Sequence, residues 1–223
     1  MKHGDKMVTK EVGLIEYSSK VDFCNSATHA AGAALAVAGA VALVMKAEGL
    51  RETVAVLIYA LSLFAVYFIS ALYHGLPAGE SKRRARLADH TAIPILIAGT
   101  ATPCALITLF QVSKGSGVFV LAVAWGCAAF GVISKLFFFR KLRGVTVAVY
   151  IISIVLMLSS GVPLLDRIDN DAFNLLLYGN VAYALGAICC GLGIKRERFH
   201  VVFHLFVLAA SIFHFYAIYN YVL

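Results

Sequence analysis

Residues 53–76 read TVAVLIYALSLFAVYFISALYHGL and contain no Asp, Glu, Lys or Arg. A helix needs about 20 mostly apolar residues to cross the hydrocarbon core of a bilayer, so this stretch is long enough. The strands of a membrane barrel are about half as long and alternate apolar with polar residues, which this stretch does not do. We therefore predict a transmembrane helix, with Ser70 and His74 on one face near its end.

Six more apolar runs of similar length lie on either side of this stretch. Their predicted bounds are 24–45, 88–110, 117–139, 145–165, 172–194 and 199–222. The runs leave only short loops between them, so the sequence predicts an all-α fold, a bundle of seven transmembrane helices. We divide the chain into an N-terminal cytoplasmic segment, residues 1–23, and a seven-helix domain, residues 24–223.

The composition excludes other classes of protein. Hydrophobic residues make up 61% of the chain and charged residues 14%, whereas soluble domains have about 45–50% and about 25%. The net charge of +7 comes from basic clusters between apolar runs, which favours contact with anionic membrane lipids rather than nucleic acid. The cysteines lie within or beside apolar runs and indicate neither disulfides nor a thiolate metal site.

The basic residues also predict the orientation of the bundle. With the N-terminus in the cytoplasm, 15 Lys and Arg residues fall on the cytoplasmic side and 4 on the outer side. Cytoplasmic loops carry such an excess, so we predict a cytoplasmic N-terminus and an outer C-terminus in a multi-pass protein of the cell membrane. Residues 1–23 have no apolar core and are not a secretory signal.

Polar groups gather at the cytoplasmic ends of four predicted helices. His200 and His204 are four residues apart in the seventh span and so share one helix face, as Ser70 and His74 do in the second. The third span begins with Asp89. The first span carries Asn25 and His29 at the same spacing of four. Ionisable groups inside a membrane are costly and mark candidate functional sites.

This set of residue types predicts a metal site. His200 and His204 can direct two nitrogens at one Zn²⁺, and His74 from another helix would complete three ligands. A fourth position would stay open for water or substrate, with Asp89 placed to accept a proton and Ser70 to support the site. The alternative is that these histidines only tie helices together by hydrogen bonds.

His214 lies ten residues beyond His204, about 15 Å deeper in the membrane and too far for the same metal. We interpret it as a buried hydrogen-bonding side chain or a polar group lining a cavity. The roles of Asn25 and His29 stay open.

The order of these motifs resembles the progestin and adipoQ receptor superfamily. The motifs are Ser70-x3-His74, then Asp89, then His200-x3-His204. The additional Asn25-x3-His29 and the short loops are similar to its bacterial branch, the hemolysin III family. The resemblance extends over all seven spans.

The resemblance implies seven helices with a cytoplasmic N-terminus and a zinc ion near the cytoplasmic leaflet. It implies that His74, His200 and His204 bind this ion, that Asp89 holds a water beside it, and that Ser70 supports the site. The adiponectin receptors of this superfamily and the similar alkaline ceramidases are associated with hydrolysis of the ceramide amide. The bacterial branch is named for haemolysis and is linked to lipid homeostasis.

Three functions compete. The first is a zinc-dependent hydrolase of lipid amides or esters, or a lipid-homeostasis protein using the same site, with membrane lipids as partners. The second is a cytolysin, which the near-continuous apolar spans disfavour because such a protein does not travel through water. The third is a channel, transporter or sensor in which the histidines relay an ion. Almost all ionisable groups lie at one face of the membrane, which disfavours an ion path through the bundle.

Overall fold

The computed structural model describes residues 13–15, 17–139, 141–161 and 169–223, and all regular structure within these ranges is helical. The segments are, in chain order, α2 (Ser19–Lys46), α3 (Gly49–Gly75), α4 (Glu80–Pro103), η1 (Cys104–Leu109), α5 (Phe110–Val112), α6 (Lys114–Phe138), α7 (Arg143–Gly161), α8 (Asn170–Gly193), α9 (Arg198–Ala217) and η3 (Ile218–Val222). The segments η1 and η3 are π-helical and continue α4 and α9. The predicted all-α fold is confirmed.

Among the described residues, six helical segments are long and apolar enough to cross a membrane. They are Ser19–Lys46, Gly49–Gly75, Glu80–Val112, Lys114–Phe138, Asn170–Gly193 and Arg198–Val222. The chain is therefore a multi-pass membrane protein. The predicted span 145–165 corresponds to α7, whose apolar part, Gly144–Ser159, is shorter. The end of that predicted span lies outside the described residues, and the count of seven stays a prediction.

The helix α4 begins well before the predicted start of its apolar run at residue 88. Its first two turns are charged, yet Lys82 and Arg86 are only 6% and 8% exposed. Lys82 Nζ lies 2.6 Å from Asp22 Oδ2 of α2, and the Arg86 guanidinium lies over the ring of Phe139. These contacts keep a charged turn helical, which an apolar pattern cannot predict.

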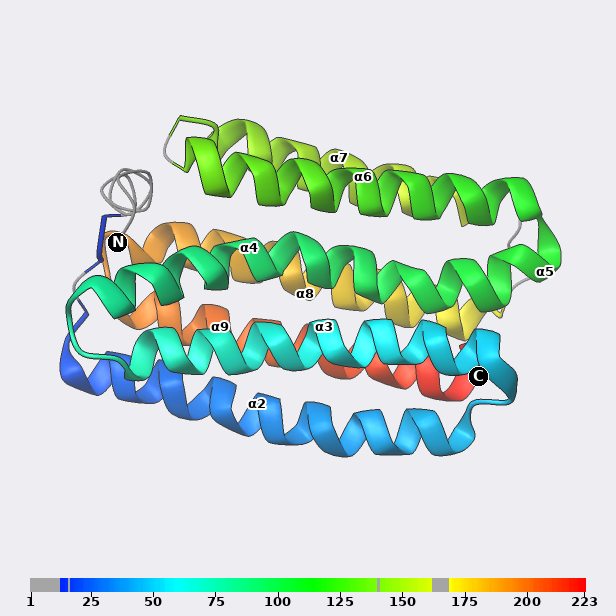
Figure 1. Ribbon diagram of the computed structural model, residues 1–223, viewed down its shortest axis with the longest axis horizontal. Helices are drawn as coiled ribbons and strands as arrows, with labels where there is room; N and C mark the ends of the chain where they lie inside the picture. Colours follow the sequence, from blue (N-terminus) through cyan, green and yellow to red (C-terminus); the bar gives the residue numbers. More distant parts are fainter. Residues whose placement is uncertain (1–12, 16, 140, 162–168) are drawn as a thin grey trace.

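The long helices run back and forth between the two ends of the molecule (Figure 1). Helix α2 packs on α3, α3 on α4, α4 on α6, and α6 on α7. Helix α8 packs on α9, and α9 returns to contact α2. The first and last long helices are thus neighbours, which brings residues from both ends of the chain together.

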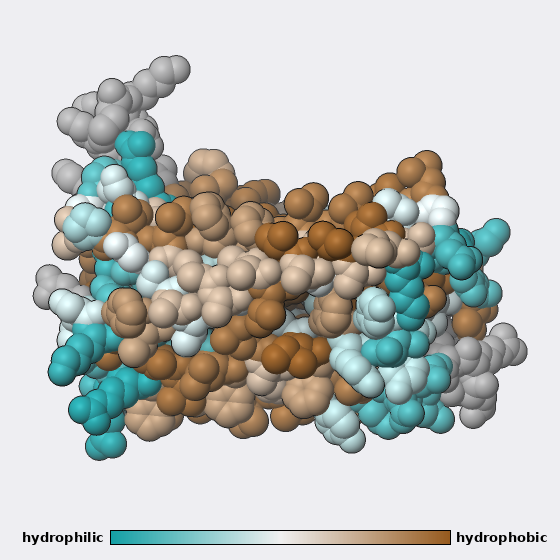
Figure 2. Space-filling view, turned by 90° about the horizontal axis from the view of Figure 1, so that it is seen from below, coloured by the Kyte–Doolittle hydropathy of each residue, from teal (hydrophilic) through white to brown (hydrophobic). Residues whose placement is uncertain are grey.

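Apolar side chains cover the middle of the outer surface, and polar side chains gather at both ends (Figure 2). The interior between α2 and α3 contains small residues such as Ala33, Ala36 and Ala55. At Gly32 an added Cβ would lie 2.7 Å from the Tyr67 ring and 2.9 Å from Leu208. Small residues let helices approach closely in a membrane, and here they bring α2, α3 and α9 together.

Candidate metal centre

Four helices present polar side chains at one end of the bundle, on the left in Figure 1. Helices α2, α4 and α9 begin at this end, and α3 terminates there. Polar residues far apart in the sequence therefore lie at a similar depth.

Three histidines form the centre of this region. His74 comes from the last turn of α3, and His200 and His204 come from the start of α9. One nitrogen from each ring lies within 4.8 Å of the others. The ring centroids are 5.0 Å apart for His74–His204 and His200–His204, and 5.3 Å apart for His74–His200. The structure thus brings together all three predicted ligands.

The nitrogens of this group suit a metal ion. His74 Nε2 and His204 Nδ1 are buried and have no hydrogen-bond partner among the described residues. A buried polar nitrogen without a partner is costly, and bonding to a metal would remove that cost. Three imidazoles with a fourth position open form a donor set typical of catalytic zinc. Within the described ranges, no second cluster of three His, Cys, Asp or Glu side chains has this spacing.

Asp22, in the first turn of α2, contacts this cluster and was not among the predicted site residues. Its Oδ1 lies 2.8 Å from His74 Nδ1, and its Oδ2 lies 2.6 Å from Lys82 Nζ. The sequence division at residue 23 placed Asp22 outside the helical domain. One signal could have identified it, because Asp22 precedes Asn25 by three residues and His29 by seven, on the same helix face.

His29 and Asn25 line the cluster from α2. The ring of His29 stacks on His204 with centroids 3.7 Å apart and meets Tyr67 edge-on at 5.0 Å. Among the described residues, neither nitrogen of His29 has a side-chain hydrogen-bond partner, nor does Asn25 Oδ1, although both side chains are buried. These polar atoms lie beside the three histidines without belonging to the group that shares one metal position.

Tyr17, just before α2, packs against the histidine cluster. Its ring stacks on His200 at 4.9 Å and lies 5.6 Å from His74. Burial raises the pKa of the Tyr17 hydroxyl well above its usual value, so this side chain is neutral at physiological pH. No sequence pattern predicted this contact, because Tyr17 precedes every apolar run.

Asp89 and Ser70 lie at the same end of the bundle but are not part of the three-histidine group. The Asp89 carboxylate pairs with His90, with Oδ2 and Nδ1 3.3 Å apart. It also interacts electrostatically with His29, His74 and His200. Ser70 is buried one turn before His74 on α3. Their predicted roles therefore stay predictions.

Two further expectations agree with the structure. His214 is buried, and its Nε2 lies 3.2 Å from the Leu176 carbonyl oxygen of α8, so it is a hydrogen-bonding group outside the cluster. Among the described residues, the five cysteines form no disulfide with one another.

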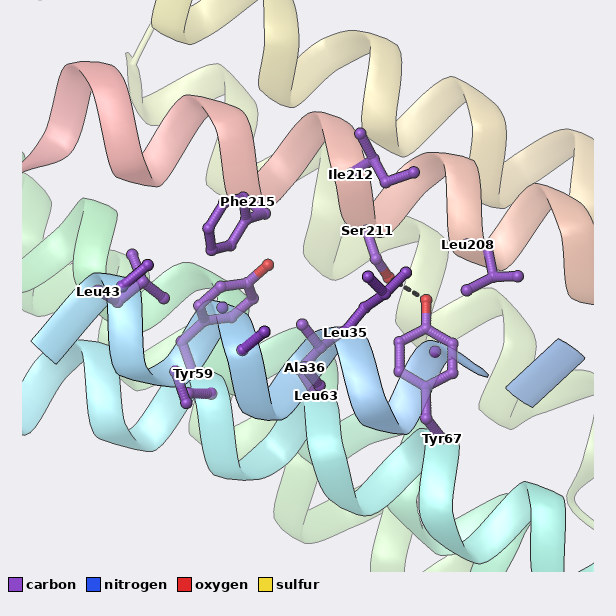
Figure 3. A pocket seen from close by; sticks show the side chains of 16 residues that line it. Leu35, Ala36, Leu43, Tyr59, Leu63, Tyr67, Leu208, Ser211, Ile212 and Phe215 are labelled. Carbon is purple, nitrogen blue, oxygen red and sulfur yellow. Dashed lines mark hydrogen bonds between the residues drawn. The ribbon is translucent and has the colours of Figure 1, made fainter. Parts of the chain in front are cut away.

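An apolar cavity of about 410 Å³ lies between α2, α3 and α9 (Figure 3). Tyr59 and Tyr67 of α3 form one wall, and Phe215 of α9 lies opposite (Figure 3). The Tyr67 hydroxyl donates to Ser211 Oγ at 2.7 Å. Because Tyr67 also contacts His29, the cavity and the histidine cluster share this side chain.

Comparison with known proteins adds independent information. A family model described as "Haemolysin-III related" matches residues 17–215. The chain is 35% identical over 220 residues to Hemolysin-3 of Bacillus cereus, which covers 97% of this chain and 98% of that protein. It is 30% identical over 199 residues to the Hemolysin-3 homolog of Bacillus subtilis (strain 168), with 87% and 91% covered. No solved structure matches this chain.

Proposed function

This chain belongs to the haemolysin-III related family, and from that premise we propose that it is a zinc-dependent protein acting on membrane lipids. It would hydrolyse lipid amides or esters, or use the same site in lipid homeostasis. Its partners are membrane lipids and not nucleic acid. We propose seven spans as well, with α7 as the fifth, a cytoplasmic N-terminus and an outer C-terminus.

The observation that supports this proposal most directly is the grouping of His74, His200 and His204 within 4.8 Å. These three side chains would hold the zinc ion. When bound, zinc polarises a carbonyl group and lowers the pKa of water towards neutrality. The other residues described below would position the lipid and move protons.

Asp89 is our candidate for the proton acceptor, because it interacts electrostatically with His29, His74 and His200 and lies on α4 at the same end of the bundle. His90, 3.3 Å from it, would hold its second oxygen. Ser70, one turn before His74, would support the ligand helix. A carboxylate close to the reacting carbonyl can act as a general base.

The apolar cavity supports a lipid substrate. It opens towards the bilayer between α2 and α9, where Leu35 and Ile212 are 62% and 60% exposed. An acyl chain could lie there while the polar part of the lipid reaches the histidines past Tyr67. The basic cytoplasmic loops would attract an anionic headgroup.

Metal analysis of the purified protein tests this proposal. We expect about one zinc per chain by mass spectrometry, and loss of zinc in His74→Ala and in the double variant His200→Ala/His204→Ala. His214→Gln is the matched control, because it changes a buried histidine of α9 outside the cluster and should keep the metal. Lipid amide and ester assays on the zinc-loaded protein follow. Folded wild type without zinc would contradict the proposal.

A proton relay is the second candidate, and a run of buried hydroxyls favours it. Ser211 Oγ lies 2.7 Å from the Tyr67 hydroxyl and 3.0 Å from the Tyr183 hydroxyl. His29 lies near one end of this run and His214 near the other, with ring centroids 5.0 Å from Tyr67 and 5.5 Å from Tyr183. Proton flux into proteoliposomes, lost in Ser211→Ala, would favour a relay over hydrolysis.

Lysis of cells, which the relatives' name Hemolysin-3 indicates for those proteins, is the third candidate. We place it last, because six long apolar helices keep the protein in its own membrane. Haemolysis would then follow indirectly from altered lipids. Purified protein in lipid nanodiscs should not lyse erythrocytes.

A further inference from the structure

Asp22 joins three helices at the histidine cluster. Its carboxylate in α2 contacts His74 of α3 through Oδ1 at 2.8 Å and Lys82 of α4 through Oδ2 at 2.6 Å. The side chains of His74 and Lys82 are 1% and 7% exposed, and that of Asp22 is 18% exposed. Both oxygens of this carboxylate are thus engaged in a largely buried place.

The contact with Asp22 determines which nitrogen of His74 is available. A carboxylate only accepts hydrogen bonds, so Nδ1 must carry the proton that it donates to Asp22. The other nitrogen, Nε2, then has a free lone pair. His74 Nε2 is buried, and no described residue hydrogen-bonds to it. This is the arrangement in which a carboxylate fixes the tautomer and the ring orientation of a metal-ligating histidine.

Asn25 does not replace Asp22 in this role. Asn25 Nδ2 lies 3.4 Å from the same His74 Nδ1, beyond the usual range for a hydrogen bond between nitrogen atoms. Both groups are donors when Nδ1 is protonated, so this contact is repulsive or neutral in the tautomer that Asp22 stabilises. The shorter, charge-assisted contact with Asp22 is the stronger one.

We propose that Asp22 is a positioning residue for the metal centre, holding the His74 ring so that Nε2 points at the position shared with His200 and His204. Lys82 fixes the second oxygen of Asp22 and compensates its charge. This inference rests on the proposed zinc site, since a positioning role requires a metal to be bound.

Metal affinity tests this role directly. We would strip purified protein of metal and measure zinc affinity by chelator competition, with the visible spectrum of bound Co²⁺ as a probe of ligand geometry. Asp22→Ala should weaken zinc binding by about 10–100-fold and alter the Co²⁺ spectrum. Asp22→Glu, which keeps a carboxylate, should recover part of that affinity.

Ser26→Ala is the matched control. Ser26 Oγ donates to the Ala71 carbonyl oxygen at 2.9 Å, so this variant removes another α2–α3 hydrogen bond at the same end without touching His74. It should bind zinc like the wild type. Helix content and thermal unfolding of each metal-free variant would show that the chains are folded.

The outcomes separate the two proposals. If wild type and Asp22→Ala bind zinc with equal affinity, the positioning role of Asp22 is overturned, while the proposed zinc site stands. If Ser26→Ala and Asp22→Ala weaken zinc binding equally, the positioning role of Asp22 is also overturned. The loss would then come from weaker packing of α2 on α3, and not from the His74 ring. Folded wild type without zinc would overturn both proposals.

Discussion

At the scale of single residues, two tyrosines of α3 differ in how their hydroxyls are satisfied. The Tyr67 hydroxyl donates to Ser211 Oγ at 2.7 Å. The Tyr59 hydroxyl is buried with no hydrogen-bond partner among the described residues. Both rings are almost fully buried, at 1% and 2% exposed for Tyr59 and Tyr67, so their apolar contributions are alike. The Tyr67 hydroxyl also lies 3.2 Å from the Val207 carbonyl oxygen, so comparing the two tyrosines isolates the contribution of the hydrogen bonds of one buried hydroxyl (Figure 3).

We predict opposite effects of removing these hydroxyls. Tyr67→Phe should lower the free energy of unfolding by about 1 kcal/mol, because it leaves Ser211 with one partner fewer. Tyr59→Phe should be neutral or stabilising, because it removes a buried polar group that forms no bond. Thermal unfolding in detergent measures both. An equal loss in the two variants would contradict this interpretation of the tyrosines.

At the scale of helices, close packing of α8 on α9 holds the second half of the cluster in place. A Cβ added at Gly179 of α8 would lie 2.4 Å from His214 Cδ2 and Nε2 of α9. The same His214 Nε2 lies 3.2 Å from the Leu176 carbonyl oxygen. Gly179 thus leaves the space in which a buried histidine reaches the backbone of the neighbouring helix.

We expect Gly179→Ala to separate these helices. The His214 ring would have to move and lose its contact with Leu176, at a cost of about 1–3 kcal/mol typical of overpacking. Gly191→Ala on the same helix is the control, because no atom lies within 4 Å of its added Cβ. Alanine is the better helix former, so this control should be neutral or stabilising. Comparison of the two unfolding temperatures tests the prediction, and equal shifts would contradict it.

At the scale of the whole molecule, the placement of charge predicts which side each terminus faces. The end of the bundle that carries the histidines also carries the buried Lys82 and Arg86, the loop residue Arg196 and Arg198 at the start of α9. A basic end of this kind faces the cytoplasm. The histidine cluster would then lie at the depth of the cytoplasmic leaflet.

Reporter fusions to the full chain test this orientation and the count of seven spans. Alkaline phosphatase needs disulfides that form outside the cytoplasm, so its fusion after Leu223 should be active. A fluorescent protein that folds only in the cytoplasm should be dark at the same position and bright at the N-terminus. A bright C-terminal fusion would indicate an even number of spans.

The sequence by itself determined the features that depend on local spacing. The length of the apolar runs identified the helices. About 20 apolar residues in a helix span the hydrocarbon core, and the helix forms its backbone hydrogen bonds internally. A spacing of four placed His200 beside His204 on one face of a helix. His214 was also interpreted correctly, from its distance along the helix. The charged start of α4 was missed, because partners on other elements, and not its own composition, keep it helical.

Only the tertiary structure decided which helices face each other at the cluster. The contact of Asp22 with His74 and the stacking of His29 on His204 each join residues of two different helices, and spacing along the chain does not predict either partner. Helices in a bilayer pack by close fit of small and large side chains, since apolar burial alone does not distinguish one neighbour from another. Local periodicity therefore predicts the face on which a polar residue lies, and packing between helices selects its partner.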